Sequence, residues 1–381
     1  MLELIEQAQA LDERRQLLGL APAVSDWFER EQPDLVIFYN ERSIAAACMQ
    51  FAARVVGSKV LWIGEGLLPH TMQVDERGLD ADASCRRWRA KDFSVVAPDK
   101  ALLDAALTHA LAGGEPLALP RAPVQMPLLS RRVADTLSYL VRGRFQAAKT
   151  ALHGWRAPFA SGQQDFNPSP LKGLKPPFVA VLLQHAKDPR VVLDASSPPD
   201  AGTLVHHALL AADQIGTDTQ VVAVLPSNAI DCRLDARVLT SKLSNRVRIA
   251  APSNAAVLAS TAVATITINH PAATVAQLAG TPVVHLGRAL YELPGVTTIT
   301  TVEGLPAAIA SAQMMDRKAL RERFLTWTLR YGHVWCSTTA PNHNGMLGLV
   351  QAVERRLQSD ENSNTRPLAY RPGPTWPLAV T

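Results

Sequence analysis

Residues 265–297 read TITINHPAATVAQLAGTPVVHLGRALYELPGVT. The pattern predicts a buried strand at 264–268, a sharp turn at 269–271 and a helix that stops at Gly280, followed by a second buried strand. Strand, helix and strand in this order are typical of a parallel α/β unit. In open sheets of this kind, ligands bind at the carboxyl ends of the strands and at the helix N-termini that follow. This stretch therefore predicts both the fold class and the position of a ligand site.

The same alternation appears on both sides of residues 154–177, which are rich in Gly, Pro, Ser and Asn and are the best candidate for a linker. Before them, residues 34–39 and 59–63 read as buried strands around a helix of small residues at 44–56. After them, strands are expected at 178–183, 220–225, 247–250, 264–268 and 282–286. We therefore predict an α/β fold of two Rossmann-like domains with an interdomain cleft.

The predicted domains are an N-terminal Rossmann-like domain at 1–153 and a C-terminal one at 178–357. Residues 358–381 are polar and then rich in proline, and we expect them to be a disordered tail. Two Rossmann-like halves suit glycosyltransferases of the GT-B type, and they also suit epimerases and binding proteins. The fold alone therefore leaves the function open.

The composition argues against several classes of protein. A formal net charge of +4 over 381 residues gives no reason to expect nucleic acid as a partner. The cysteines show no CxxC spacing, so we expect reduced thiols and no metal site. We expect no signal peptide, because residues 1–15 show an acidic and basic helical pattern, and no apolar run has the length of a membrane span. We expect a cytoplasmic protein, and peripheral contact with the inner face of the membrane stays open.

Three segments carry a family resemblance, and the first is residues 267–297. The second is Leu183-Gln184-His185-Ala186-Lys187-Asp188, and the third is Glu65-Gly66-Leu67-Leu68-Pro69 with the acidic stretch 75–82. Together they resemble the signature of the bacterial capsular polysaccharide synthesis and export family, which includes the β-Kdo transferases. The first segment keeps, without a gap, the following residues of that signature: Thr267, Ile268, Asn269, Ala276, Gly280, Pro282, Val283, Leu286, Gly287, Ala289, Tyr291, Pro294, Gly295 and Thr297.

The resemblance implies a GT-B fold and transfer of Kdo or a related sugar from a CMP-linked donor to a glycolipid or polysaccharide acceptor. The second domain would bind the nucleotide-sugar donor, and the first would bind the acceptor. Because the nucleotide-sugar is a substrate, no cofactor is expected.

Four candidate donor-binding residues follow predicted strands. Gln184 and Asp188 follow the strand at 178–183, and their amide and carboxylate suit the base or the ribose. Arg288 and Tyr291 lie in the loop after the strand at 282–286, from which they could close over the nucleotide. Without the resemblance, a strand-end turn and a solvated rim explain these residues as well.

Two further candidates, Asn269 and His270, flank the start of the helix that follows Pro271. The free N–H groups of a helix N-terminus stabilise a phosphate, so we expect the donor phosphate here. A lone histidine in such a place is more often a cap or a surface residue. The family context favours a phosphate contact for His270.

Glycosyl transfer needs a carboxylate near the anomeric carbon, either as a general base or as a nucleophile. Asp75 and Asp82 are the first candidates and Glu65 is the third, because all of them follow the strand at 59–63. The alternative is a plain acidic turn, since Asp and Gly in DERGLDAD favour turns.

The chain departs from the family signature where the donor phosphate would bind. The two hydroxyl residues after the signature's Asn are here His270 and Pro271, and its Lys and His align with Ala223 and Leu225. The Arg of the third segment aligns with Leu68. Loss of a cation and of hydroxyl donors weakens a phosphate site. Two other hypotheses therefore stand: a non-catalytic scaffold or partner subunit, and a transferase that uses a different nucleotide-sugar, such as a UDP-linked one.

Overall fold

The structure, a computed structural model, describes residues 11–39, 44–112, 174, 176–185, 188–195, 198–226, 246–314, 317–336 and 343–358. The chain divides into a larger unit, Met1–Leu117 with Leu171–Thr381, and a smaller one, Ala118–Pro170. The smaller unit lies outside the described residues, as do Cys232, most of the predicted linker and nearly all of the predicted tail. Every contact below belongs to the larger unit.

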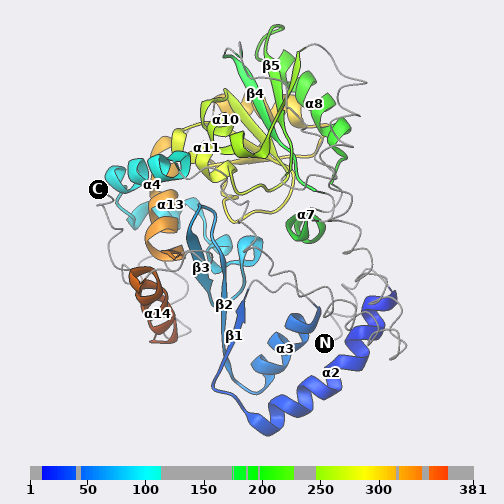
Figure 1. Cartoon of the computed structure of the whole chain (residues 1–381), viewed down its shortest axis with the longest axis vertical. Helices are drawn as coiled ribbons and strands as arrows, with labels where there is room; N and C mark the ends of the chain where they lie inside the picture. Colours follow the sequence, from blue (N-terminus) through cyan, green and yellow to red (C-terminus); the bar gives the residue numbers. More distant parts are fainter. Residues whose placement is uncertain are drawn as a thin grey trace, which may run out of the picture. The chain divides into compact units, whose positions relative to one another are not determined.

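Six described strands form a parallel sheet, in the order β6-β5-β4-β7-β8-β9. Figure 1 labels two of them, β4 and β5. In chain order they are β4 (Phe178–Leu182), β5 (Gln220–Val224), β6 (Val247–Ala250), β7 (Ala264–Thr267), β8 (Val283–His285) and β9 (Thr298–Ile299). The strands predicted from 178 to 286 are thus confirmed to within a residue at each end. Because β5 and β6 lie on one side of β4 and the later strands on the other, the strand order reverses between β4 and β7. Ligands of open α/β sheets bind at such a switch point.

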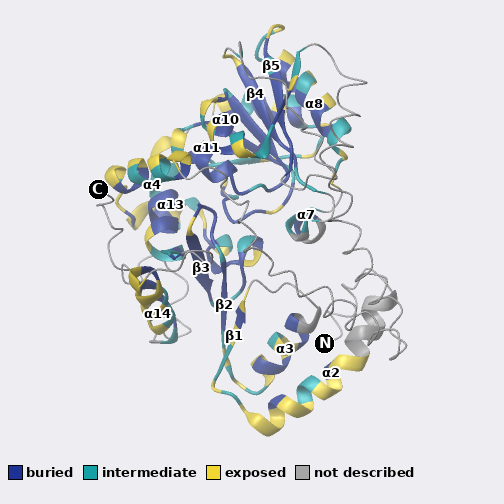
Figure 2. Cartoon of the chain, in the orientation of Figure 1, coloured by how far each residue is buried: buried dark blue, intermediate teal, exposed yellow. Residues whose placement is uncertain are grey.

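Helices cover both faces of this sheet because the central strands are apolar on both faces, as in β4, whose five residues are all apolar and buried. Along β4, Phe178 and Leu182 join one core cluster, whereas Val179 and Val181 join a second cluster. The first cluster includes residues of α10 (Ala255–Thr261) and α11 (Ala273–Ala279), and the second includes residues of α8 (Ala201–Asp213) and α12 (Leu305–Met314). Figure 2 shows β4 and β5 as buried strands. The second half of the chain is therefore Rossmann-like, as predicted.

The stop signal predicted at Gly280 is confirmed. Gly280 has a φ of 87°, in the left-handed region, and its N–H donates to the carbonyl oxygens of Ala276 and Gln277. Glycine adopts this conformation without the steric cost of a Cβ. The chain then turns directly into β8.

A second sheet contains four described strands, in the order β1-β2-β3-β10. β1 (Leu35–Tyr39) and β2 (Lys59–Glu65) are parallel and are joined by α3 (Ile44–Val55), which confirms the first predicted β-α-β unit. The helix α2 (Leu11–Glu31) precedes β1. β3 (Thr71–Asp75) runs antiparallel to β2, and β10 (His333–Trp335) runs antiparallel to β3. The two sheets together give the predicted α/β, GT-B-like class.

The last described part of the chain packs on this mixed sheet, which differs from the predicted domain boundary. The sequence placed residues up to 357 in the second domain, but β10 pairs with β3, and α14 (His343–Gln358) packs on β10, β3 and β2. Ile63 and Met72 form a core cluster with Cys336 and Ala352. The apolar face of β2 and β3 needs a cover, and a helix distant in sequence supplies it.

Residues 76–112 connect the two sheets through a shared core. After β3 the chain forms short 3-10 helices, the first of which is Asp80–Asp82, and then α4 (Lys100–Ala112). Trp88 and Phe93 pack edge to face on Trp327, the last residue of α13 (Lys318–Trp327). The helix α4 packs on α11. This packing fixes the acidic turn Asp80–Asp82 within reach of the parallel sheet.

Candidate functional site

Two side chains meet at the switch point of the parallel sheet. Gln184 follows β4 and Asn269 follows β7, and these strands are neighbours. Nε2 of Gln184 donates to Oδ1 of Asn269 at 2.8 Å, and the backbone N–H of Asn269 donates to Oε1 of Gln184 at 2.8 Å. The hydroxyl of Thr267 donates to the same Oε1 at 3.3 Å. The structure therefore brings two predicted donor-binding residues together, and their amides bind one another.

Asn269 also holds two arginines in place. Its buried Nδ2 donates to the carbonyl oxygen of Arg190 at 2.8 Å and to the carbonyl oxygen of Arg288 at 3.3 Å. Gly287 permits this close approach, since a Cβ there would lie 3.3 Å from Nδ2 of Asn269 and 3.0 Å from the side chain of Ile268. One amide group thus fixes the backbone of both arginines at the carboxyl edge of the sheet.

Arg190 lies in the first turn of α7 (Pro189–Asp194). Asp188 caps this helix, because its Oδ1 accepts from the N–H of Arg190 at 2.8 Å, and Pro189 suits the first helical position. Nε of Arg190 donates to Oδ2 of Asp80 at 3.2 Å, and these side chains are 23% and 16% exposed. Burial would lower the pKa of Arg190, but Asp80, Asp188 and Glu65 together raise it, so the guanidinium stays charged.

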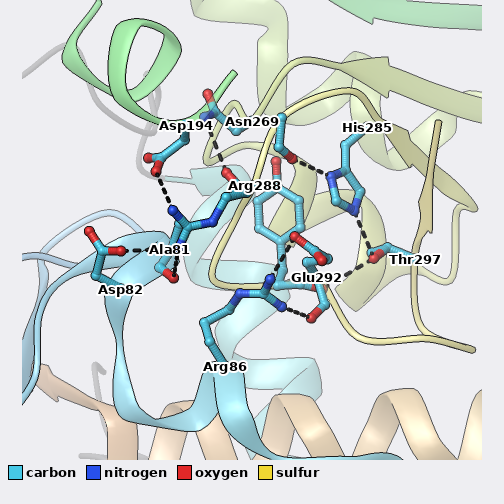
Figure 3. A network of polar contacts seen from close by, with 11 residues as sticks. Ala81, Asp82, Arg86, Asp194, Asn269, His285, Arg288, Glu292 and Thr297 are labelled. Atoms are coloured by element: carbon cyan, nitrogen blue, oxygen red, sulfur yellow. Dashed lines mark hydrogen bonds and ion pairs between the residues drawn. The ribbon is translucent and has the colours of Figure 1, made fainter. Parts of the chain in front are cut away.

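Arg288 binds three oxygen atoms of two other segments (Figure 3). Its Nη2 donates to the carbonyl oxygen of Ala81 and to Oδ1 of Asp82, each at 3.0 Å, and its Nη1 lies 3.9 Å from Oδ1 of the buried Asp194. The side chains of Arg288 and Asp82 are 51% and 46% exposed. An ion pair this exposed stabilises by about 1 kcal/mol or less, so a competing anion could displace it.

Glu65 and Asp80 complete the charged cluster around Arg190. Asp80 has a φ of 52°, in the left-handed region that Asp adopts more readily than most residues, and its N–H donates to Oε1 of Gln73 at 3.1 Å. Burial raises the pKa of the Glu65 carboxyl, Arg190 opposes this rise and Asp80 adds to it. A carboxyl group with a raised pKa suits general acid or base catalysis near neutral pH.

Asp75, a first choice from the sequence, holds a loop. Its Oδ1 accepts from the N–H groups of Arg77 at 2.8 Å and Gly78 at 3.3 Å. Its Oδ2 accepts from the N–H of Ser84 at 3.0 Å and from its hydroxyl at 2.7 Å. The carboxylate is buried at the end of β3. These surroundings give Asp75 the task of shaping the loop 76–84 and give no support to a catalytic role.

His270 caps the turn before α11. Its Nδ1 accepts from the N–H of Ala272 at 3.1 Å, and burial, with a smaller effect of Arg190, lowers its pKa to about 4. The ring is therefore neutral at pH 7. The N–H groups of the next three residues, 273–275, bond to the carbonyl oxygens of 270–272. The prediction that this turn offers free N–H groups to a phosphate is wrong, because the turn itself uses them.

Tyr291 supports the same turn from within the core. Its hydroxyl donates to the carbonyl oxygen of His270 at 3.1 Å, and its ring packs edge to face on His285. Burial raises the pKa of the Tyr291 phenol well above its usual value. The sequence led us to expect that Tyr291 could close over a nucleotide, but a side chain so enclosed supports the turn from within the core instead.

A further ion pair, between Arg86 and Glu292, is drawn in the same network of polar contacts (Figure 3). Nη2 of Arg86 lies 2.7 Å from Oε2 of Glu292, and Nη1 donates to the carbonyl oxygen of Glu292. His285 contacts the same loop, with Nδ1 2.7 Å from the carbonyl oxygen of Gly287 and Nε2 3.1 Å from the hydroxyl of Thr297. These contacts join the loop after β8 to residues 80–87.

The residues that align with the family's phosphate-binding Lys and His give no charge to the site. Ala223 is buried in β5, and Leu225 is buried just after it. Positive charge comes instead from Arg190 and Arg288. The family resemblance gave no reason to expect these two arginines together.

Sequence reasoning missed Arg190, Asp80, Asp194 and the Arg86–Glu292 pair. For Arg190 a local signal existed, since Asp-Pro after a strand predicts a helix cap with the next residue in the first turn. For Asp80 the stretch 75–82 was identified, but no local rule shows which of its acids reaches an arginine 110 positions away. The pairing depends on how the segments pack.

Three further properties concern the described residues. Cys48, Cys85 and Cys336 are buried free thiols. In the part of the chain that the structure describes, no three His, Cys, Asp or Glu side chains gather as a metal site would require. No described helix combines the length and the apolar character needed to cross a membrane.

The chain was compared with known families and structures. No protein family model matches it, and no curated protein sequence matches it. Among solved structures, the Thermosulfurimonas dismutans KpsC β-Kdo 2,4 transferase is similar at 17% identity, over 86% of this chain and 92% of that one, with a TM-score of 0.46. The β-Kdo 2,7 transferase of the same KpsC is similar at 13% identity, over 87% and 89%, with a TM-score of 0.40. S. aureus MnaA in complex with UDP is similar at 11% identity, over 90% and 79%, with a TM-score of 0.35.

Proposed function

We propose that this chain is a glycosyltransferase of capsular or surface polysaccharide synthesis. It transfers Kdo or a related sugar from a CMP-linked donor to a glycolipid or polysaccharide acceptor. The observation that carries the proposal is that the three motif segments, distant in sequence, meet in one place. Gln184 binds Asn269, and Arg190 and Arg288, held by Asn269, bind Asp80 and Asp82.

The donor lies at the switch point between β4 and β7, where parallel sheets bind nucleotides. Arg288 contacts the donor phosphate, because its guanidinium is half exposed and anchored at this edge. Gln184 and Asn269 position the arginines. Asp188, His270 and Tyr291 maintain the turns that hold them.

Asp82 and Glu65 are the proposed carboxylates of the reaction. The acceptor hydroxyl forms the new bond to the anomeric carbon, the bond to the CMP oxygen breaks, and a carboxylate takes the hydroxyl proton. Asp82 suits the base because its carboxylate is half exposed, and Glu65 suits it because its pKa is raised. Asp75 does not, since its oxygens are bound within the loop.

Thermal shift with CMP, UDP, GDP and their sugars tests donor binding, and CMP or CMP-Kdo is expected to give the largest rise in melting temperature. Asp82→Asn and Glu65→Gln are expected to lower the rate of transfer from CMP-Kdo by about 100-fold or more while the protein stays folded. Asp213→Asn is the matched control, because it removes an aspartate of similar exposure, 43%, from an unrelated ion pair with Arg246. Unchanged rates in both site variants would exclude these residues as the base.

One observation favours a non-catalytic scaffold or partner subunit instead. Asp75, Asp188, Gln184 and Tyr291 all use polar atoms in contacts within the chain. A scaffold predicts no rise in melting temperature with any nucleotide at millimolar concentration. A rise with UDP or a UDP-sugar, and none with CMP, points to a transferase with a different donor.

A further inference from the structure

Two guanidinium groups lie at the switch point with a common anchor. The carbonyl oxygens of Arg190 and Arg288 accept hydrogen bonds from the same atom, Nδ2 of Asn269. The backbone N–H of Arg288 also donates to the carbonyl oxygen of Asp194. Asp194 is the last residue of α7, the helix that contains Arg190. The two arginines are therefore held as one structural element.

Each of these arginines binds a carboxylate from one short turn. Asp80 binds Arg190 and Asp82 binds Arg288, and both acids belong to the 3-10 helix Asp80–Asp82. A carboxylate offers a guanidinium the same fork of oxygen atoms that a phosphate offers. The turn thus presents two oxyanions to two arginines, as a nucleotide diphosphate or a phosphate beside a sugar carboxylate would.

Among the residues that the structure describes at this edge, several other candidate phosphate-binding groups are already used or lack charge. The N–H groups of residues 272–275 are bound within their own turn, and His270 is neutral. Arg86 is bound to Glu292. Among these described groups, Arg190 and Arg288 are the ones anchored by Asn269 at the switch point, so we expect an anion there to compete for them.

We propose that Arg190 and Arg288 form the anion-binding pair of this chain, and that the turn Asp80–Asp82 occupies the pair as an internal competitor. A phosphorylated ligand binds when the turn releases the arginines. The turn keeps the site closed to weakly bound anions and admits those that carry more than one negative charge. This inference rests on the proposed function for the identity of the ligand, but not for the presence of the anion site.

The competition predicts opposite effects for acid and arginine variants. We would measure the affinity for inorganic pyrophosphate by isothermal titration calorimetry at low ionic strength, where charge pairs are least screened. Asp82→Asn is expected to bind about threefold to fivefold more tightly than the wild type, and the double variant with Asp80→Asn at least about tenfold more tightly. Arg190→Gln and Arg288→Gln are each expected to bind about tenfold more weakly.

Asparagine is the appropriate replacement at position 80, since it tolerates the left-handed conformation that Asp80 adopts. Asp213→Asn and Arg246→Gln are the controls for change of charge, because their ion pair belongs to other elements, and both are expected to match the wild type. If the double variant does not fold, the single variant Asp82→Asn tests the inference by itself, because the Asp82 side chain is half exposed.

Equal or weaker pyrophosphate binding in folded Asp82→Asn overturns the inference. So does the absence of binding at millimolar concentration in both the wild type and the double variant. Suppose that the wild type transfers sugar from CMP-Kdo while the Asp82→Asn and double variants bind pyrophosphate no more tightly than it does. That result rejects the competition and leaves the proposed function intact. Tighter pyrophosphate binding without transfer from any nucleotide-sugar would reject the proposed function alone.

Discussion

Gln184 and Asn269 use both polar atoms of the Gln184 amide to bind each other across neighbouring strands, with both hydrogen bonds at 2.8 Å. The pair ties β4 to β7 where the strand order reverses. The side-chain amide of Asn269 also donates hydrogen bonds to the backbone carbonyl oxygens of Arg190 and Arg288, which holds both backbones in place. The same two residues therefore determine both the stability of the sheet edge and the geometry of the charged site.

Asn269→Ala is expected to lower the free energy of unfolding by about 1–3 kcal/mol, because the buried Asn269 side chain and its partly buried partner, the Gln184 amide, lose their hydrogen bonds. A double-mutant cycle with Gln184→Ala in urea is expected to give a coupling energy of about 0.5–3 kcal/mol. Gln351→Ala, on the exposed face of α14, is the control and should stay within about 0.5 kcal/mol of the wild type. Additive effects of the two site substitutions would contradict the pairing.

Asp75→Asn is expected to destabilise the protein by about 2 kcal/mol, because the loop 76–84 depends on hydrogen bonds to a charged carboxylate. Urea unfolding measures this effect. Asp104→Asn, at an exposed position of α4, removes the same charge without such contacts and should have little effect. If Asp75→Asn keeps wild-type stability but loses transfer, Asp75 has the catalytic role that its surroundings argue against.

His333 is expected to make stability depend on pH. Its buried Nε2 accepts from the N–H of Leu67 at 3.0 Å, and burial lowers its pKa to about 4. The unfolded chain takes up a proton below its ordinary pKa of about 6.5, whereas the folded protein does so only near 4. The stabilisation is therefore complete above pH 6.5 and is lost as the pH falls toward 4, by roughly 3 kcal/mol in total.

Urea unfolding of the wild type and of His333→Gln between pH 7.5 and 4.5 measures this dependence. The free energy of unfolding of the variant is expected to fall less steeply toward acid pH than that of the wild type, whatever its value at pH 7.5. His206→Gln, on an exposed position of α8, should keep the wild-type slope. Parallel curves for His333→Gln and the wild type would show that His333 contributes nothing to the decline.

The same substitution, glycine to alanine, is expected to have opposite effects at Gly280 and at Gly19. Gly280 has a φ of 87°, so Gly280→Ala is expected to cost about 1 kcal/mol. Gly19 lies inside α2 with no atom within 4 Å of an added Cβ, so Gly19→Ala is expected to stabilise by about 0.5–1 kcal/mol. Thermal unfolding of the two variants compares the signs, and a stabilised Gly280→Ala would argue against the left-handed turn.

Local pattern was sufficient for the elements of the parallel sheet. Buried apolar runs predicted β4 to β8 closely, and the end of α11 at Gly280 followed from glycine's backbone freedom. In the mixed sheet, local pattern predicted β1 and β2 but missed β3 and β10. The pairing of β10 with β3 joins residues 333–335 to 71–73, and nothing in either short segment specifies a partner so distant in sequence.

The candidate site shows the same division. The sequence by itself determined that polar and charged residues gather at the carboxyl ends of β4, β7 and β8, because each follows a recognisable strand. Only the tertiary structure decided which distant groups meet: Gln184 and Asn269 bind each other, and the turn Asp80–Asp82 faces two arginines. The physical reason is that periodicity and turn chemistry act over a few residues, whereas a hydrogen bond or an ion pair depends on which distant segments pack together.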